Sequence, residues 1–158
     1  MLKVLIAYDS RRGTTRAVAE RIGLVARGTT PDVTVAPVGL LRPEDAAAAD
    51  LIFLGAWVRG LFVVGAGPSS GAMEWTATLP TLEGKLAAVF CTYDFDPKAT
   101  LTKLAEPLRA RGAEVLAGHA SRRRNRFAGV DEFARAVMSS VRDRTGVRSA
   151  GDRSLASS

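Results

Sequence analysis

The amino-acid sequence predicts an α/β fold, a three-layer doubly wound sandwich with a five-stranded parallel sheet between two layers of helices. Short apolar runs alternate with segments whose apolar residues recur at helical spacing, and this alternation occurs five times along the chain. The runs are too short for helices and are apolar throughout, which is typical of strands covered on both faces. The length of 158 residues corresponds to about one domain, and no internal repeat is visible.

The first half of the chain contains three predicted strands and three predicted helices. The first helix is the clearest, because Val18, Ile22 and Val25 recur at i, i+4 and i+7 and so share one helix face. A second helix is indicated by Pro43, a residue that suits the first helical turn. We predict strands over residues 2–8, 32–38 and 51–55, helices over 14–27, 43–49 and 71–78, and a loop over 56–70.

The second half continues the alternation. We predict strands over residues 86–91 and 114–119, a helix over 98–111, and a last helix whose apolar positions run from Val130 to Val141. Pro107 lies inside the penultimate helix, where it removes one backbone donor and should kink the helix. Residues 143–158 lack apolar periodicity and are rich in Arg and Ser, so we predict a folded domain over 1–142 and a disordered tail over 143–158.

The composition excludes several classes of protein. Hydrophobic residues make up 47% and charged residues 24% of the chain, as in ordinary globular proteins. No apolar run is long enough to span a bilayer and no signal-peptide layout is visible, so we expect a cytoplasmic location. Cys91 is the single cysteine, which excludes a disulfide framework. No metal-ligand cluster and no acid–base or nucleophile–histidine pair is evident, so neither a metal nor a catalytic side chain is predicted.

The positive charge is concentrated at the C-terminal end. Residues 1–120 hold 13 basic and 12 acidic side chains, a net of +1, whereas residues 121–158 hold 9 and 4, a net of +5. A uniform nucleic-acid-binding face would not show this distribution, so nucleic acid is not an expected partner.

Residues with binding chemistry follow the predicted strands, where ligands bind in open α/β sheets. The loop over residues 9–15, Asp-Ser-Arg-Arg-Gly-Thr-Thr, leads into the first predicted helix. Its hydroxyl groups, the small Gly13 and the free N–H groups of a helix start suit a phosphate monoester. An ordinary helix cap at Ser10 or Thr14 is the alternative interpretation.

This loop resembles the phosphate loop of flavodoxins, whose pattern is Ser-x-Thr-Gly-x-Thr. Ser10, Gly13, Thr14 and Thr15 match, whereas Arg12 stands where the family usually has Thr. Two arginines would bring charge to the phosphate, although one expected hydroxyl is lost. The resemblance continues through residues 50–55 and 82–90 and covers residues 1–142. It implies the flavodoxin strand order 2-1-3-4-5 and flavin mononucleotide (FMN) as the cofactor.

In flavodoxins, two further loops enclose the flavin ring, often with an aromatic side chain on each side. Here these loops follow the third and fourth strands, and Trp57 and Tyr93 are the implied stacking residues, with Phe62 as a substitute for Trp57. Alternatively, both aromatics anchor their loops. The expected cofactor-binding residues are Ser10, Arg11, Arg12, Gly13, Thr14, Thr15, Ala56, Trp57, Val58, Arg59, Gly60, Thr92, Tyr93, Asp94 and Phe95.

Four arginines occur between residues 122 and 126, after the last strand, and should lie at the same edge as the flavin. They form either a solvated loop or a docking patch for an acidic partner or an anionic substrate. Common flavodoxins are acidic, so this chain departs from the family pattern. Positive charge near the ring should favour the reduced, anionic flavin and raise its potential.

The resemblance implies an FMN-dependent redox protein that acts in electron transfer with a redox partner protein. A second hypothesis is an FMN-dependent oxidoreductase, because residues 11–16 and 55–59 also resemble loops of quinone-dependent protoporphyrinogen oxidases. Those enzymes carry a long insertion after the fourth strand, whereas here Tyr93 is followed closely by the helix predicted from residue 98. A third hypothesis is a flavin-free interaction domain, which the unusual Arg12 supports.

Overall fold

A parallel sheet with the strand order β2-β1-β3-β5-β6 forms the centre of the molecule. The computed structural model describes residues 1–59, 67–97 and 99–156, the last twelve of these by their backbone alone. The order is the predicted one counted over the five main strands, so the predicted fold class is confirmed. The main strands are β1 (Val4–Tyr8), β2 (Val33–Pro37), β3 (Leu51–Arg59), β5 (Leu86–Tyr93) and β6 (Glu114–Arg122).

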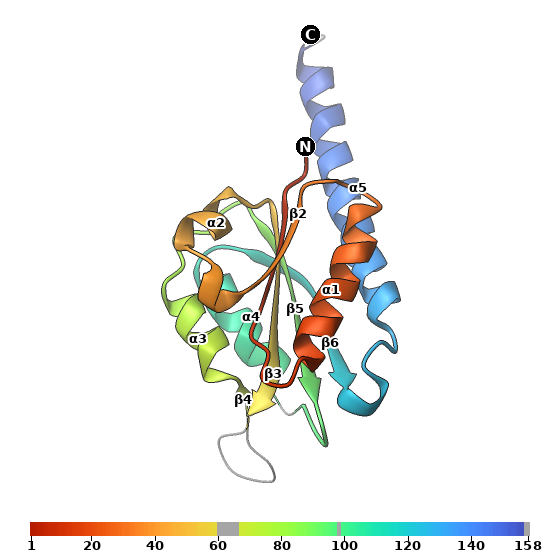
Figure 1. The fold of residues 1–158 in the computed structure, drawn as a ribbon. Coiled ribbons are helices and arrows are strands. Elements are labelled where there is room, and N and C mark those ends of the chain that lie inside the picture. Colours follow the sequence, from red (N-terminus) through yellow and green to blue (C-terminus); the bar gives the residue numbers. More distant parts are fainter. Residues whose placement is uncertain (60–66, 98, 157–158) are drawn as a thin grey trace.

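Helices cover both faces of the sheet, as Figure 1 shows. Two of them, α1 (Thr14–Arg27) and α5 (Val130–Ala156), pack together on one face. The opposite face carries α2 (Pro43–Ala48), α3 (Ser70–Ala77) and α4 (Thr100–Ala110). Two short 3₁₀ helices are also present, η1 (Val38–Leu40) and η2 (Arg123–Asn125).

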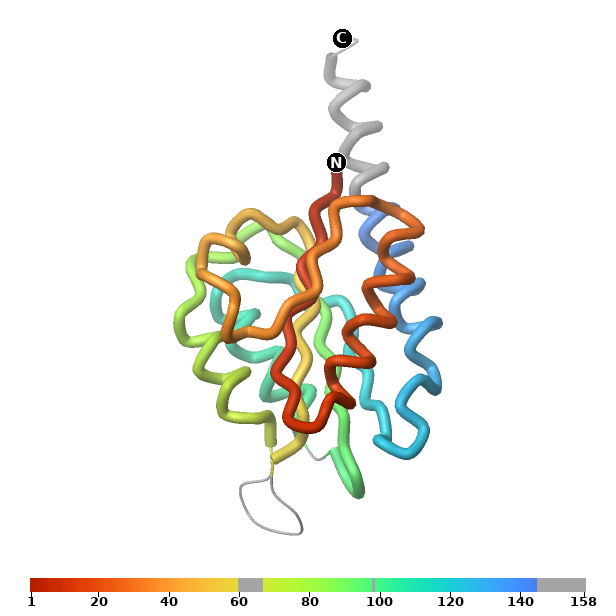
Figure 2. The backbone as a smooth tube through the Cα atoms, viewed as in Figure 1, coloured from red at the N-terminus to blue at the C-terminus, as the bar shows by residue number. Residues whose placement is uncertain are grey.

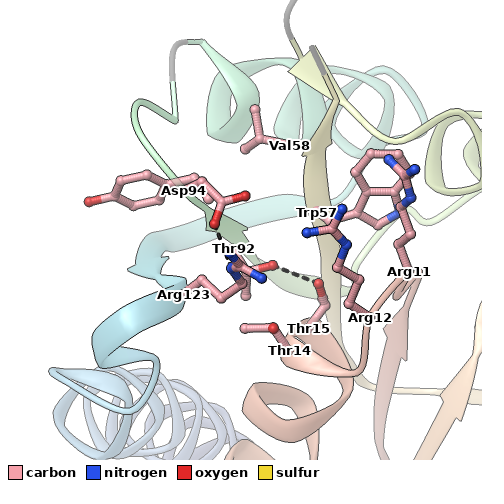
Figure 3. Close-up of a pocket in the computed structure, with 10 residues that line it drawn as sticks. Arg11, Arg12, Thr14, Thr15, Trp57, Val58, Thr92, Asp94 and Arg123 are labelled. Atoms are coloured by element: carbon pink, nitrogen blue, oxygen red, sulfur yellow. Dashed lines mark hydrogen bonds and ion pairs between the residues drawn. The ribbon is translucent and has the colours of Figure 1, made fainter. Parts of the chain in front are cut away.

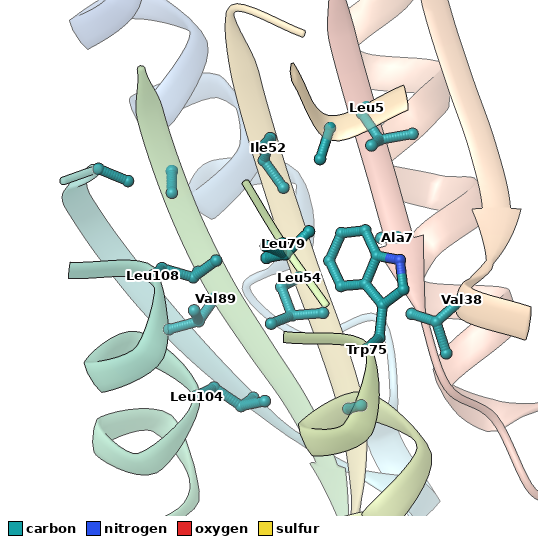
Figure 4. Packing of buried hydrophobic residues seen from close by; sticks show 14 of the residues in the cluster. Leu5, Ala7, Val38, Ile52, Leu54, Trp75, Leu79, Val89, Leu104 and Leu108 are labelled. Carbon is teal, nitrogen blue, oxygen red and sulfur yellow. The ribbon is translucent and has the colours of Figure 1, made fainter. Parts of the chain in front are cut away.

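The side chains of each central strand alternate between two separate cores. In β1, Val4 and Ile6 join the core under α1 and α5, whereas Leu5 and Ala7 join the core under α2, α3 and α4. Figure 4 shows the second core, in which Trp75 of α3 lies over the sheet. Fully burying a Leu, Ile or Phe side chain stabilises the folded state by about 1.5–3 kcal/mol. This two-sided burial explains why the strands read as continuous apolar runs.

Gly55 of β3 allows an aromatic ring to lie directly on the sheet. A Cβ added at Gly55 would overlap the ring of Phe90, which is fully buried in the neighbouring strand β5. The ring therefore packs on the bare backbone of Gly55. Gly55 is the last residue of the predicted third strand, but in the structure it lies in the middle of β3.

Three strands run further than the sequence predicts. The register between β3 and β5 continues through Ala56–Cys91 and Trp57–Thr92, and that between β5 and β6 continues through Tyr93–Arg122. Hydrogen bonds between neighbouring strands extend the sheet beyond the apolar runs, and periodicity does not report such bonds. The predicted loop over 56–70 is therefore wrong at residues 56–59, which belong to β3, and at β4 (Gly67–Pro68), which pairs antiparallel with the end of β3.

The ends of the last two helices also differ from prediction. Helix α4 keeps Pro107 in its final turn, where the missing N–H removes one helical hydrogen bond. Helix α5 continues to Ala156, where the sequence predicts a disordered tail from residue 143. A helix makes its backbone hydrogen bonds within itself and needs no apolar face to do so. Near the boundary, Arg144 holds Glu114 of β6 at 2.7 Å. The domain and tail boundary itself stays a prediction.

The structure gathers the carboxyl ends of β1, β3, β5 and β6 at one end of the molecule, beside the start of α1 (Figure 2). Of the described helices, none has the length and apolar composition needed to cross a membrane.

Candidate functional site

A cavity lies at the carboxyl end of the sheet, between the start of α1 and the ends of β3 and β5. It contains about 640 Å³ of empty space, its open mouth included. Figure 3 shows side chains from four segments around it. Its lining consists of Arg11, Arg12, Thr14, Thr15, Trp57, Val58, Thr92, Tyr93, Asp94 and Arg123.

The loop before α1 is closed by a serine hydroxyl. Ser10 Oγ accepts hydrogen bonds from the backbone N–H of Gly13 at 3.1 Å and of Arg16 at 3.3 Å. Gly13 is the N-cap residue and has φ +89°, a left-handed conformation that glycine adopts without strain. The N-cap residue Gly13 supplies no side-chain cap, and the Ser10 hydroxyl satisfies the N–H of Arg16 in the first turn instead, so part of the capping interpretation of Ser10 holds.

The first turn of α1 forms part of the cavity wall through Thr14 and Thr15. The N–H groups of Thr14 and Thr15 have no acceptor inside the helix, because the first donors of any α-helix precede the repeating bonds. A Cβ added at Gly13 would meet no atom within 4 Å, so the space above the loop is open. Free N–H groups, the positive helix end and two lining arginines together make an anion-binding geometry.

A buried hydroxyl pair joins this helix start to the sheet. Thr15 Oγ1 and Thr92 Oγ1 lie 2.7 Å apart, and both residues are almost fully buried. One hydroxyl donates to the other, which leaves the second proton available to a further acceptor. The pair also holds the first turn of α1 against the end of β5, so the two segments keep a set separation.

Two aromatic residues in the lining each have an arginine side chain close to the ring. The guanidinium carbon of Arg11 lies 5.3 Å from the ring centre of Trp57, and that of Arg122 lies 5.8 Å from that of Tyr93. These separations are within the range of cation–π attraction. Trp57 and Tyr93 belong to the last part of β3 and to the end of β5, and so they stand on paired strands rather than on free loops.

An ion pair connects the end of β5 to η2. Arg123 Nε donates to Asp94 Oδ1 at 2.5 Å, and both side chains are about half exposed. The sequence places the arginine cluster at this edge but does not select Arg123 as a site residue. Only the β5–β6 pairing and the turn into η2 bring Arg123 to the cavity.

The structure brings nine of the fifteen predicted binding residues into the lining of one cavity. Ser10 and Gly13 shape the loop beneath it instead, and Ala56 is buried in the core under α3 and α4. Arg59 ends β3 opposite Gly67, and Phe95 lies in an adjoining groove. Gly60, and the alternative stacking residue Phe62, lie outside the described residues. The binding role of each remains a prediction.

Cys91 takes no part in this cavity. Its side chain is buried in the core under α3 and α4, where burial raises the pKa of the thiol to about 12. The thiol is therefore protonated at neutral pH, which agrees with the packing role that its position in a predicted strand suggests.

The fold is similar to those of solved flavodoxins. Flavodoxin 2 from Bacillus cereus is 25% identical with a TM-score of 0.75, over 87% of this chain and 99% of that one. The flavodoxin of Megasphaera elsdenii is 22% identical with a TM-score of 0.75, over 86% of this chain and 98% of that one. No family model matches the sequence, and no curated protein matches it significantly.

A longer protein contains the same unit. The rubredoxin oxygen:oxidoreductase of Desulfovibrio gigas is 15% identical with a TM-score of 0.74, over 90% of this chain but 37% of that one. At these identities the similarity establishes the fold and leaves the chemistry to the residues of the cavity.

Proposed function

Because the chain has the flavodoxin-like fold, we propose that it is an FMN-binding redox protein that acts in electron transfer. One observation carries this proposal. The anion-binding loop at the start of α1 and two aromatic residues, Trp57 and Tyr93, line the same cavity although they come from three separate segments. A phosphate and a flat ring are the two parts of FMN that such a cavity would hold.

The residues around the loop fit a phosphate monoester. The donors are the N–H groups of the first turn of α1, the hydroxyl of Thr14 and the guanidinium groups of Arg11 and Arg12. Charge-assisted hydrogen bonds to phosphate are about twice as strong as neutral ones. Arg12 therefore replaces the hydroxyl that flavodoxins usually have at this position with a stronger donor, which weakens the case for a flavin-free domain.

The lining of the cavity also fits a flat ring. Trp57 and Tyr93 supply aromatic surface from adjacent strands, and Val58 adds an apolar side chain. Offset stacking of aromatic rings contributes about 0.5–1.5 kcal/mol beyond the burial of area. We infer that Trp57 and Tyr93 would hold the ring and that Thr92 and Asp94, which also line the cavity, would supply polar groups beside it.

When bound, FMN would supply the redox chemistry, by accepting and giving electrons at its ring. The side chains of this chain would position the ring, exclude water and set the local charge. Of the described residues that line the cavity, Arg11, Arg12 and Arg123 are positive and Asp94 alone is negative, and Arg123 already pairs with it. This excess of positive charge favours the more negative, reduced state and so raises the midpoint potential.

The similar proteins support a redox role. The Megasphaera elsdenii flavodoxin was solved in its two-electron reduced state and the Bacillus cereus flavodoxin 2 in its oxidised state. The rival enzyme hypothesis loses support, because only residues 94–99 separate β5 from α4, and no long insertion is present there. A cytoplasmic location remains a prediction of the sequence.

Titration of the purified protein with FMN and with riboflavin tests the proposal. We expect FMN to bind with quenched flavin fluorescence, and riboflavin to bind at least tenfold more weakly because it lacks the phosphate. The Trp57→Ala variant should weaken both ligands by a similar factor, since it removes a ring contact only. Failure of FMN to bind, or equal affinity for the two flavins, would remove the basis of the proposal.

A further inference from the structure

A second groove adjoins the cavity and is dominated by arginine. It contains about 780 Å³ of empty space with its mouth included, and it shares Arg12, Asp94 and Arg123 with the cavity. A ligand in the cavity and a partner in this groove would therefore contact the same side chains. We call the four arginines of this groove the arginine rim: Arg12, Arg122, Arg123 and Arg124.

The arginine rim is strongly and locally positive. Among the described residues that line the groove, Asp94 alone carries a carboxylate, and Arg123 already holds it at 2.5 Å. Residues 1–120 as a whole have a net charge of only +1, so this groove differs sharply from the rest of the folded body. A local charge of this kind attracts oppositely charged partners and orients their approach.

Several of the arginines are held in place by neighbouring groups. Arg122 lies over the ring of Tyr93, and Arg123 is fixed by Asp94. Beside the rim, the guanidinium carbon of Arg126 lies 4.9 Å from the ring centre of Phe127. Ordering side chains on binding costs about 0.5–1.5 kcal/mol for each flexible group, so groups that are already held lose less.

Exposed aromatic side chains accompany these cations. Phe95 lines the groove and is 59% exposed, and Phe127, just beyond η2, is 43% exposed. Arginine and aromatic residues are the types enriched at protein–protein interfaces and among the side chains that dominate binding energy. Guanidinium groups also bind carboxylates through two parallel hydrogen bonds, which lysine does not provide.

We propose that the arginine rim and Phe95 form a docking surface for an acidic partner protein, one that presents Asp and Glu side chains around an apolar contact. The inference rests on the proposed function, because a partner seated in this groove would lie against the mouth of the flavin cavity. That adjacency favours a protein that exchanges electrons over a nucleic acid. The charges of the two partners are the reverse of those in a complex where an acidic electron carrier docks on a basic protein.

A flavin-independent binding assay tests the docking surface. The probe is a fluorescein-labelled peptide of eight Glu and two Leu residues, compared with a Gln-for-Glu peptide and with a dT9 oligonucleotide carrying eight phosphates. The full chain is titrated with each at low salt, with and without FMN. We expect the acidic peptide to bind, the Gln peptide not to bind, and the affinity to fall as salt is added.

Charge-matched variants locate the binding. Arg122→Gln with Arg124→Gln should weaken acidic-peptide binding about tenfold, whereas Arg27→Gln with Arg109→Gln, two exposed arginines elsewhere, should leave it within twofold. The single variant Arg124→Gln should weaken acidic-peptide binding about threefold. This variant tests the docking surface if the double variant does not fold. Phe95→Ala should also weaken binding of the acidic peptide, but without changing the salt dependence of that binding.

Two results would overturn the inference: equal weakening by the two double variants, or tighter rim-dependent binding of dT9 than of the acidic peptide. The FMN titration of the same samples reports separately on the proposed function. Rim-dependent peptide binding by a chain that does not bind FMN would support the docking surface and reject the redox function.

Discussion

The two ends of the parallel sheet use polar residues for different purposes. At the amino end, Asp50 accepts a hydrogen bond from the backbone N–H of Lys3 at 2.8 Å, and Lys85 Nζ donates to the carbonyl of Ala49 at 2.6 Å. These bonds connect turns to the body of the fold. At the carboxyl end, Arg11 and Arg12 lie on a cavity wall with a helix start beside them.

The direction of the chain explains this difference. All five main strands run the same way, so their carboxyl ends and the start of α1 meet on one side. Helix starts have free N–H groups and a positive dipole end, which attract anions. The amino end of the sheet lacks this advantage, so its charged side chains are available to stabilise turns. Binding and stability should therefore respond to different substitutions.

The interior that both ends share should be the most sensitive region. Gly55→Ala forces a methyl group into the ring of Phe90 and should lower the free energy of unfolding by about 3 kcal/mol, the upper end of the overpacking range. Urea unfolding measures the change. Gly39→Ala is the matched control, because a Cβ there meets no atom within 4 Å. Equal stability of the two variants would contradict the described packing.

A pair of variants should separate binding from stability. Arg12→Ala removes a charge-assisted contact to phosphate worth about 1.5–3 kcal/mol, so FMN affinity should fall about 10–150-fold while the unfolding midpoint stays the same. Lys85→Ala should lower stability by about 1 kcal/mol and leave FMN affinity unchanged. Isothermal titration and urea unfolding of both variants give the four values. Loss of FMN affinity in Lys85→Ala would show that the two ends are coupled.

The buried thiol should make stability depend on alkaline pH. The pKa of Cys91 is about 12 in the folded chain against 9.0 for an exposed thiol, so its contribution to stability is complete below pH 9 and declines between pH 9 and 12. Between pH 8 and 10 the wild type should lose roughly 1 kcal/mol more than Cys91→Ala. Urea unfolding at both pH values measures this difference. Parallel pH curves for the two proteins would mean that the thiol titrates normally.

The smallest expected effect is on the redox potential. Arg12→Thr restores the residue usual in flavodoxins and removes one positive charge near the ring, so the midpoint potential of bound FMN should fall by about 30–60 mV. Redox titration with dye equilibration measures it, and Arg109→Gln is the distant control. An unchanged potential would show that charge at residue 12 acts on the phosphate alone.

Much of the arrangement is readable in the sequence because it depends on local patterns. The run from Val4 to Tyr8 and the spacing of Val18 and Ile22 identify a buried strand and a helix in their observed places. The rule that ligands bind beyond parallel strands then places the loop over 9–15, Trp57 and Tyr93 at one edge.

Other features depend on contacts between distant segments. The extension of β3 past Gly55 results from pairing with β5, and the bond between Thr15 and Thr92 joins residues 77 positions apart. Arg123 reaches the cavity only because β6 continues to Arg122 and then turns into η2. None of these features produces a periodic pattern in the sequence, because each depends on which strands are neighbours in the sheet.

The sequence by itself therefore determines the order of the main elements, the buried face of each and the edge at which a ligand is expected, since these follow from residue spacing and from the direction of parallel strands. Tertiary structure alone decides which arginines line the cavity and which carboxylate they meet. Side-chain positions at a sheet edge depend on register and strand length, which are set by hydrogen bonds between segments far apart in the chain.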